Sequence, residues 1–367
     1  MSAALASVID RSHREREDWR YTNVEKLLAA MKANAPANND THGLPSIIAD
    51  VSQRQYIVFR NGVWQKDQSR LATLPAAILQ GDSATGYRLT LAALNCLVTA
   101  PIELVFLSDG EAESHLKLSI DVGSNTSLSI IEHHLATGAG NAAQVIDTDI
   151  RLGAQAKLMH KKIVHHMAGV PAFSRTDVHV EDGAYYRHFL LAKRARLMRN
   201  EIDVTLAGSL AQCGLYGALL LGGREHVDIQ TRVNHNAPHS SSQQLFKAVL
   251  KDQAHGVFQG RIKVAEGAQK TDGKQLCRAL LLSDQAEMDA KPELEIYADD
   301  VACSHGCAVG DLDADAMFYL RTRGLSEEGA RALLLRAFVD EVIDTVQADD
   351  TRSYVRDLAG GWMNEQG

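Results

Sequence analysis

The sequence predicts a mainly β protein whose core is a parallel β-helix, flanked by α-helical regions at both ends. Short runs that alternate apolar and polar residues recur along the chain, and each ends at a glycine: Gly123, Gly153, Gly183 and Gly208. These glycines lie roughly 25 to 30 residues apart, a period typical of solenoids in which each rung buries its apolar face against its neighbours. No helical pattern separates the runs, which argues against alternating strands and helices.

The composition agrees with a globular protein of this kind. At 367 residues the chain is long enough for more than one structural region. Hydrophobic residues make up 45% and charged residues 23%, which argues against disorder, and 5% aromatic residues leave small aliphatic side chains to fill the interior. The formal net charge of -8, without a long basic run, argues against nucleic acid as a partner.

The ends of the chain and its cysteines indicate a cytoplasmic protein. The first residues lack the pattern of a signal peptide, and no apolar run approaches the roughly 18 residues of a membrane helix, so we expect no membrane association. The five cysteines are odd in number and mostly scattered, which indicates reduced thiols rather than a disulfide framework.

Three regions follow from the pattern along the chain: a helical and mixed region over 1–95, the β-helix core over 96–312 and a helical region over 313–367. In the first region, Thr22 and Glu25 have the spacing of a capping box before a helical apolar pattern. The charged stretch 14–21 just upstream, which contains two aromatic residues, favours a solvated helix end. Residues 32–43 are rich in Pro and Asn and predict a polar connection.

The C-terminal region predicts a helix over about 326–346. Ser326 is followed by two carboxylates in the first turn, where they favour the helix dipole. One apolar stripe contains Ala330, Leu333, Leu334, Ala337 and Phe338, and a second contains Leu335, Val339, Val342 and Val346. One stripe can pack on the body of the chain, which leaves the other for a partner or for more of the same chain.

Cys303, His305 and Cys307 alternate along a segment predicted as a strand, so their side chains share one face. Thiolate and imidazole are both ligands for transition metals. The apolar parity of Leu294 and Ile296 indicates that the three face outward, provided that no bulge intervenes at 299–300. Neighbours on one face lie about 6.6 Å apart, so a metal with four ligands needs a further strand or chain. A surface histidine with incidental cysteines is the alternative interpretation.

Several catalytic motifs are absent from the sequence. There is no phosphate-binding loop, no dinucleotide-binding glycine pattern, no GxSxG and no HExxH. Paired carboxylates of a β-helix enzyme acting on carbohydrate could come from Asp299, Asp300, Asp311, Asp313 and Asp315. The few aromatic residues argue against a sugar-binding groove. A homomeric scaffold is a further alternative.

From residue 244 to about 344 the sequence resembles the SufB/SufD family of iron-sulfur cluster assembly proteins. The resemblance lies in the segments QLFK (244–247), FQGRIKV (258–264), KTDG (270–273), LLLS (280–283), KPELEIYADD (291–300), CSHG (303–306) and FYLRTRG (318–324). The WRY element at 19–21 also resembles the family. A glycine after His305, and the lack of a CxxC pair, favour the SufD-type members over the SufB-type ones.

The resemblance implies a right-handed parallel β-helix and a non-catalytic scaffold subunit of the SufBCD complex. Such a subunit pairs with SufB and supports iron acquisition, while ATP hydrolysis belongs to the SufC ATPase. The implied SufC-binding residues are Leu334, Leu335, Phe338, Val339 and Val342.

For the metal, the resemblance implies that His305, with Cys303 beside it, holds iron or a transient cluster opposite a SufB cysteine. Cys307 is then an auxiliary thiolate. Two questions stay open, whether the whole complex binds FAD and whether the isolated chain forms a homodimer.

Overall fold

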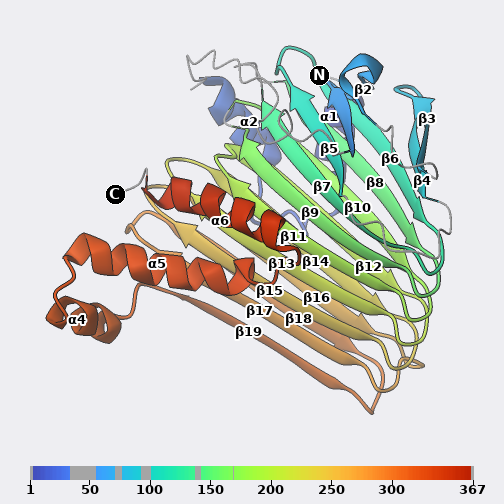
Figure 1. Cartoon of the computed structure of the whole chain (residues 1–367). Helices are drawn as coiled ribbons and strands as arrows, with labels where there is room; N and C mark the ends of the chain where they lie inside the picture. Colours follow the sequence, from blue (N-terminus) through green and yellow to red (C-terminus); the bar gives the residue numbers. More distant parts are fainter. Residues whose placement is uncertain are drawn as a thin grey trace.

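The chain winds into two long sheets that face each other (Figure 1). The computed structural model describes residues 3–33, 55–70, 77–91, 101–136, 142–167 and 169–364. Sheet A runs in the order β19-β17-β15-β13-β11-β9-β7-β5-β1-β2, and sheet B in the order β18-β16-β14-β12-β10-β8-β6-β4-β3. From β4 onward, successive strands alternate between the two sheets, and neighbours within each sheet are parallel. The predicted parallel β-helix is therefore confirmed.

The strands of sheet A are β1 (Gln55–Arg60), β2 (Val63–Trp64), β5 (Ile102–Ser108), β7 (Ser127–Ala136), β9 (Lys157–His166), β11 (Tyr185–Lys193), β13 (Gln212–Leu221), β15 (Ser241–Leu250), β17 (Asp272–Leu281) and β19 (Ala302–Gly310). Those of sheet B are β3 (Ala77–Asp82), β4 (Gly86–Leu91), β6 (Ser114–Val122), β8 (Gln144–Leu152), β10 (Ala172–Val180), β12 (Leu197–Leu206), β14 (His226–His235), β16 (His255–Val264) and β18 (Glu287–Ile296). Strands β1 to β4 come from the region that the sequence marks as mixed, and β2 and β3 pair antiparallel to β1 and β4.

The main core lies between the two sheets. Buried apolar side chains from alternate positions of successive rungs form one continuous cluster, which includes Leu158, Leu215, Ile229, Phe246 and Phe258. At the turns between strands, glycine permits close stacking. A Cβ on Gly208 would lie 2.0 Å from the backbone nitrogen of Asp182 in the rung below, and Gly183 has a φ of +62°.

A buried charged network lies inside this core. The Glu132 carboxylate is 2.9 Å from the imidazoles of both His134 and His160, and 3.5 Å from the Lys162 ammonium. Burial alone would raise the pKa of Glu132, but Lys162 and His160 hold it well below its usual range. The charge is thus compensated by specific partners on the same strand and on the neighbouring strand, as a buried ion must be.

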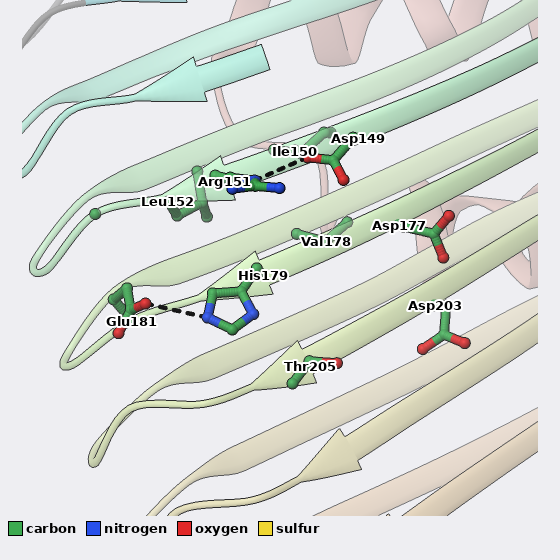
Figure 2. Close-up of a pocket in the computed structure, with 11 residues that line it drawn as sticks. Asp149, Ile150, Arg151, Leu152, Asp177, Val178, His179, Glu181, Asp203 and Thr205 are labelled. Atoms are coloured by element: carbon green, nitrogen blue, oxygen red, sulfur yellow. Dashed lines mark hydrogen bonds and ion pairs between the residues drawn. The ribbon is translucent and has the colours of Figure 1, made fainter. Parts of the chain in front are cut away.

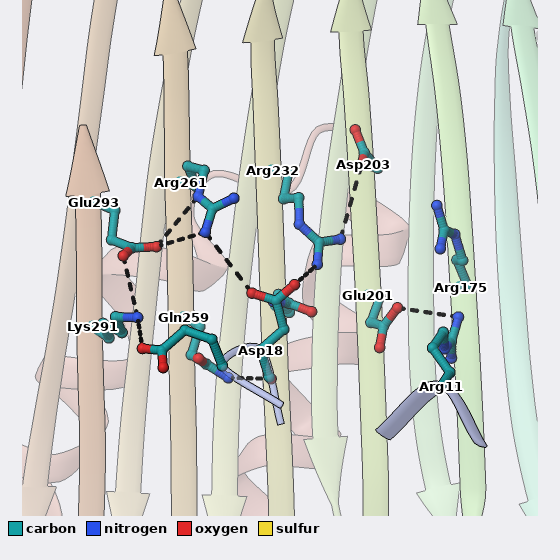
Figure 3. A network of polar contacts seen from close by, with 12 residues as sticks. Arg11, Asp18, Arg175, Glu201, Asp203, Arg232, Gln259, Arg261, Lys291 and Glu293 are labelled. Carbon is teal, nitrogen blue, oxygen red and sulfur yellow. Dashed lines mark hydrogen bonds and ion pairs between the residues drawn. The ribbon is translucent and has the colours of Figure 1, made fainter. Parts of the chain in front are cut away.

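The N-terminal segment packs on the outer face of sheet B. Helices α1 (Ala3–Arg14) and α2 (Val24–Ala33) flank a polar clamp in which Asp18 lies 2.5 Å from Arg232 and 3.8 Å from Arg261 (Figure 3). Trp19 is only 4% exposed, with the buried Arg199 guanidinium 3.8 Å from its ring centroid. The prediction of a solvated helix end at 14–21 is therefore wrong for Trp19, because sheet B covers its ring.

Helix α2 confirms the predicted helix but not its predicted cap. The Asn23 side chain accepts a hydrogen bond from the Lys26 backbone N–H at 2.9 Å. The Thr22 hydroxyl donates instead to Asp228 on sheet B, at 2.5 Å. Thr22 is buried by this tertiary contact, which takes the place of the capping box. Residues 34–43 of the predicted polar connection lie outside the described residues.

The C-terminal helices are α4 (Ala314–Thr322), α5 (Glu327–Ile343) and α6 (Asp349–Asn364). Figure 1 shows α5 and α6 lying across the outer face of sheet A. Ser326 is the N-cap of α5, as predicted, and its hydroxyl accepts from the Gly329 N–H at 3.1 Å. Lys247 on β15 donates to the Phe338 carbonyl at 2.8 Å and pairs with Glu341, which fastens α5 to the sheet. No described helix is long and apolar enough to cross a membrane.

Buried neutral histidines predict a loss of stability in mild acid. His235 is fully buried, with its ring nitrogens 2.8 and 2.9 Å from the hydroxyls of Ser240 and Ser242. Burial lowers its pKa from 6.5 to about 4. Between those values the unfolded chain binds a proton that the folded chain does not, so the free energy of unfolding falls as pH falls from 6.5 to 4.

We expect His235→Gln to reduce that slope by up to about 1.4 kcal/mol per pH unit, measured by urea unfolding at a series of pH values. His179→Gln, a change of an exposed histidine, is the matched control and should leave the slope unchanged. A slope in His235→Gln equal to that of the unaltered chain would contradict the prediction.

Candidate metal centre at the last rung

Strands β18 and β19 form the last rung of the β-helix. Among the described strands, β19 pairs only with β17 and β18 only with β16, so each is the edge of its sheet (Figure 1). The outer backbone groups of an edge strand are available to a further strand. The rung also leaves its inward-facing side chains uncovered, because no strand stacks on them.

Cys303, His305 and Cys307 lie on β19, but they do not face outward. Their register partners on β17 are Gly273, Gln275 and Cys277, which are all buried in the interior. A Cβ on Gly273 would be 3.4 Å from the Cys303 sulfur and 3.4 Å from Ile262 of sheet B, which places that thiol between the sheets. The three predicted ligands therefore belong to the inner face of the rung.

The prediction that these side chains face outward is wrong. It assumed that the inward and outward alternation of β18 continues unbroken through residues 297–301. Those residues are a turn that takes the chain from sheet B to sheet A. Alternation does not continue through a change of sheet. His305 and Cys307 are exposed nonetheless, since the rung is the last one, and Cys303 is half-buried.

The structure adds a third sulfur, and so a fourth candidate ligand, that the sequence interpretation did not include. Cys277 on β17 lies directly beneath Cys307 in the ladder and is 2% exposed. Cys277 and Cys307 are separated in the sequence by one repeat of the β-helix. This spacing could have indicated that they stack on adjacent rungs. Burial raises the pKa of Cys277 to about 12, so its sulfur stays a protonated thiol unless a metal or an oxidant acts on it.

The row of β19 is suited to binding a thiophilic or borderline ion. His305 and Cys307 present an imidazole and a thiol to solvent at the open end of the interior. Burial raises the pKa of Cys303, so a metal bound there must displace the proton of that thiol. Two or three such donors leave coordination positions unfilled, as expected for a site completed by another chain.

The predicted docking residues of α5 do not share one environment. Leu335, Val339 and Val342 are buried against the outer face of sheet A. Leu334 and Phe338 are half-buried, and Leu333 is 47% exposed. The second apolar stripe, which also contains the buried Val346, thus packs on the body of the same chain, and in this conformation its four residues offer no surface to a partner.

Free apolar surface continues from α5 onto α4. Phe318 and Tyr319 of α4 are 70% and 56% exposed. A shallow groove of about 780 Å³ runs between the two helices and is lined by Met317, Phe318, Leu325 and Arg331. Exposed aromatic side chains beside a groove are typical of an interaction surface.

Three of the five acidic residues considered for carbohydrate chemistry have structural roles. Asp313 is the N-cap of α4, Asp300 pairs with Lys270, and Asp311 accepts the Leu312 N–H at 2.7 Å. A separate hollow of about 610 Å³ crosses the outer face of sheet B, lined by Asp149, Asp177 and Asp203 (Figure 2). The same hollow is also lined by Arg151 and His179, so acidic and basic side chains are mixed in it.

Comparison with known proteins shows the family of this chain. The family model described as SUF system FeS cluster assembly, SufBD core domain, matches residues 105–338, more than half of the chain. The chain belongs to the SufB/SufD family. It is an iron-sulfur cluster assembly protein of that family, and the matched region runs from within β5 through the last rung and α4 into α5.

Relatives of this SufB/SufD-family chain include three bacterial proteins. A SufBD family protein of Synechocystis is 27% identical over 391 residues, which cover 94% of this chain and 86% of that protein. SufD of Escherichia coli is 30% identical over 261 residues, which cover 70% and 62%. A SufBD family protein of Mycobacterium tuberculosis is 25% identical over 354 residues, which cover 93% and 86%.

Thiol accessibility tests the arrangement of the last rung. We expect N-ethylmaleimide to label Cys307 first and Cys303 more slowly, because Cys303 is half-buried with a raised pKa. Cys277 and Cys213 are buried and should stay unlabelled in the folded chain. Peptide mass spectrometry over a time course measures each site separately. Early labelling of Cys277 would contradict the structure of this rung.

Proposed function

We propose that this SufB/SufD-family chain is the SufD-type scaffold subunit of a cytoplasmic SufBCD complex. In this proposal it pairs with SufB, binds the SufC ATPase and supplies His305 to the site where iron and sulfide assemble into a cluster. It catalyses no reaction itself, and ATP hydrolysis belongs to SufC. The observation that carries the proposal is the row of Cys303, His305 and Cys307 on an uncovered last rung.

Pairing with SufB is supported by the edges of the β-helix. Strands β18 and β19 end both sheets at the same rung and present unpaired backbone groups. A partner with the same fold can add strands there, which is a common mode of association. The site is incomplete within one chain, so the partner also supplies the missing ligands.

The position of His305 supports a role in holding iron or a transient cluster. Its imidazole is exposed in the middle of β19, next but one to both thiols. Imidazole and thiolate both suit iron, and neither requires a rigid protein cage. Iron and sulfide are here the cargo of the complex. A flavin on the assembled complex stays a prediction.

The test of this role is co-expression of the chain with SufB and SufC. We expect His305→Ala to form a complex of unchanged stoichiometry whose iron and acid-labile sulfide fall at least about tenfold, because a ligand has been removed from a solvent-exposed position. His179→Ala, on the outer face of sheet B, is the matched control and should retain both.

Equal iron and sulfide in His305→Ala and in the unaltered complex would refute the role of His305. If SufB and SufC fail to join the complex and the chain alone forms a stable dimer by light scattering, the homomeric scaffold replaces the proposal. The pairing and the histidine role therefore fail in distinguishable ways.

For SufC, we place the binding surface on the exposed residues of α4 and α5 rather than on the buried stripe. Phe318, Tyr319 and Leu333 are the large apolar side chains of these helices that face solvent. Leu335 and Val339 support this surface from beneath, because they hold α5 against sheet A. A change at either of them acts through folding as well as binding.

We expect Leu333→Asp to weaken SufC binding tenfold or more without loss of thermal stability, because a carboxylate at a dehydrated contact is costly. Leu210→Asp makes the same change at a residue 58% exposed on the turn between β12 and β13 and should leave binding unchanged. Leu335→Asp should instead lower the melting temperature. Calorimetric titration with SufC gives the affinities, and unaltered binding by Leu333→Asp would remove this surface from the proposal.

A further inference from the structure

A second group of metal ligands lies on the outer face of sheet B at the same end of the β-helix. His255 begins β16, and Glu287, its register partner, begins β18. Asp289 follows two residues later on the same face of β18. The His255 nitrogen and one oxygen from each carboxylate all lie within 4.8 Å of one another, and His255 Nε2 is 2.8 Å from Asp289 Oδ2.

Among the described residues, the carboxylates of this group have no Lys or Arg partner, whereas neighbouring carboxylates on the same face do. On the same face, Glu293 pairs with Lys291 and Arg261, each at 3.2 Å, and Glu201 pairs with Arg199 at 2.6 Å. Within the described ranges, no Lys or Arg forms an ion pair with Glu287 or Asp289, and His255 is the sole ion-pair partner of Asp289. Two carboxylates thus converge on a single imidazole.

The orientation of the His255 imidazole is fixed by contact with a neighbouring ring as well as by its hydrogen bond to Asp289. The His226 ring on β14, in register with His255, packs edge-on against it at a centroid distance of 4.7 Å. His226 is itself buried, and a hydrogen bond of 3.0 Å joins its Nε2 to the Thr22 hydroxyl. A ligand whose ring is already oriented by neighbouring side chains loses less freedom when it binds a metal.

We propose that His255, Glu287 and Asp289 form a binding site for a divalent first-row transition ion such as Fe²⁺ or Zn²⁺. One imidazole and two carboxylates are borderline and hard donors, which suit these ions and disfavour Cu⁺. The three ligands leave coordination positions for water or for a group from another chain. The site belongs to β16 and β18, so it is separate from the thiols and His305 of β19 and does not rest on the function proposed above.

The test uses the full chain alone, freed of metal, with Cys303→Ser and Cys307→Ser as background so that these thiolates do not bind the probe. Co²⁺ serves as the probe, followed by its visible absorbance and then displaced with Zn²⁺. We expect one equivalent to bind the background chain. His255→Phe keeps a ring against His226 but removes the ligand nitrogen, and Asp289→Asn removes the carboxylate charge; each should weaken binding at least tenfold.

The matched control is Asp147→Asn. Asp147 lies 2.7 Å from His115 on the same outer face, but this pair is not part of a described three-ligand group. We expect the control to bind Co²⁺ as the background does. Absence of Co²⁺ binding by the background chain, or unchanged binding by both His255→Phe and Asp289→Asn when circular dichroism shows them folded, would overturn the proposal. Neither result depends on whether SufB or SufC binds.

Discussion

The structure depends on the parallel ladder that joins each rung to the next. Every inner strand satisfies its backbone groups and buries its inward side chains through two neighbours, so each rung is stable only because another follows it. The last rung cannot meet this condition within one chain. The edges of this rung are unpaired, and His305 and Cys307 are exposed, because no described strand follows it in either sheet. The site that we propose a partner completes therefore lies where the fold itself is incomplete.

The outer faces of the two sheets are covered by the terminal segments, and the interior contains a buried charged network. The N-terminal segment covers part of sheet B through both charged and apolar contacts, whereas α5 and α6 cover sheet A mainly through apolar contacts. Inside, Glu132 with its histidines and Lys162 adds little net stability, because desolvation of buried charges offsets their attraction. A shift of one strand by one position would leave a charge unpaired in the core. We interpret the network as a constraint on register.

Most of the fold could be predicted because its strands repeat at a regular spacing. The turns at which the chain passes from one sheet to the other could not be predicted in the same way. Glycines at a solenoid period and the N-cap Ser326 are local signals, and both predictions are confirmed. The thiol and imidazole row was recognised, but its orientation depends on the turn at 297–301, which resets the alternation. Cys277, Trp19 and Thr22 acquire their environments from strands far away in the sequence. Nothing local distinguishes Leu333 from Leu335, since only the packing of α5 on sheet A decides which is covered.

The N-terminal clamp also has a consequence for the order in which the protein is made. Glu17 contacts Lys291 across 274 residues of sequence, and Asp18 contacts Arg232 across 214. Ribosomes add about 5 to 20 residues per second, so the first helix waits on the order of tens of seconds before its docking strands exist. During that time Trp19 has no sheet to cover it. This segment therefore leaves the ribosome well before the strands that hold it, and its docking is a late step of folding.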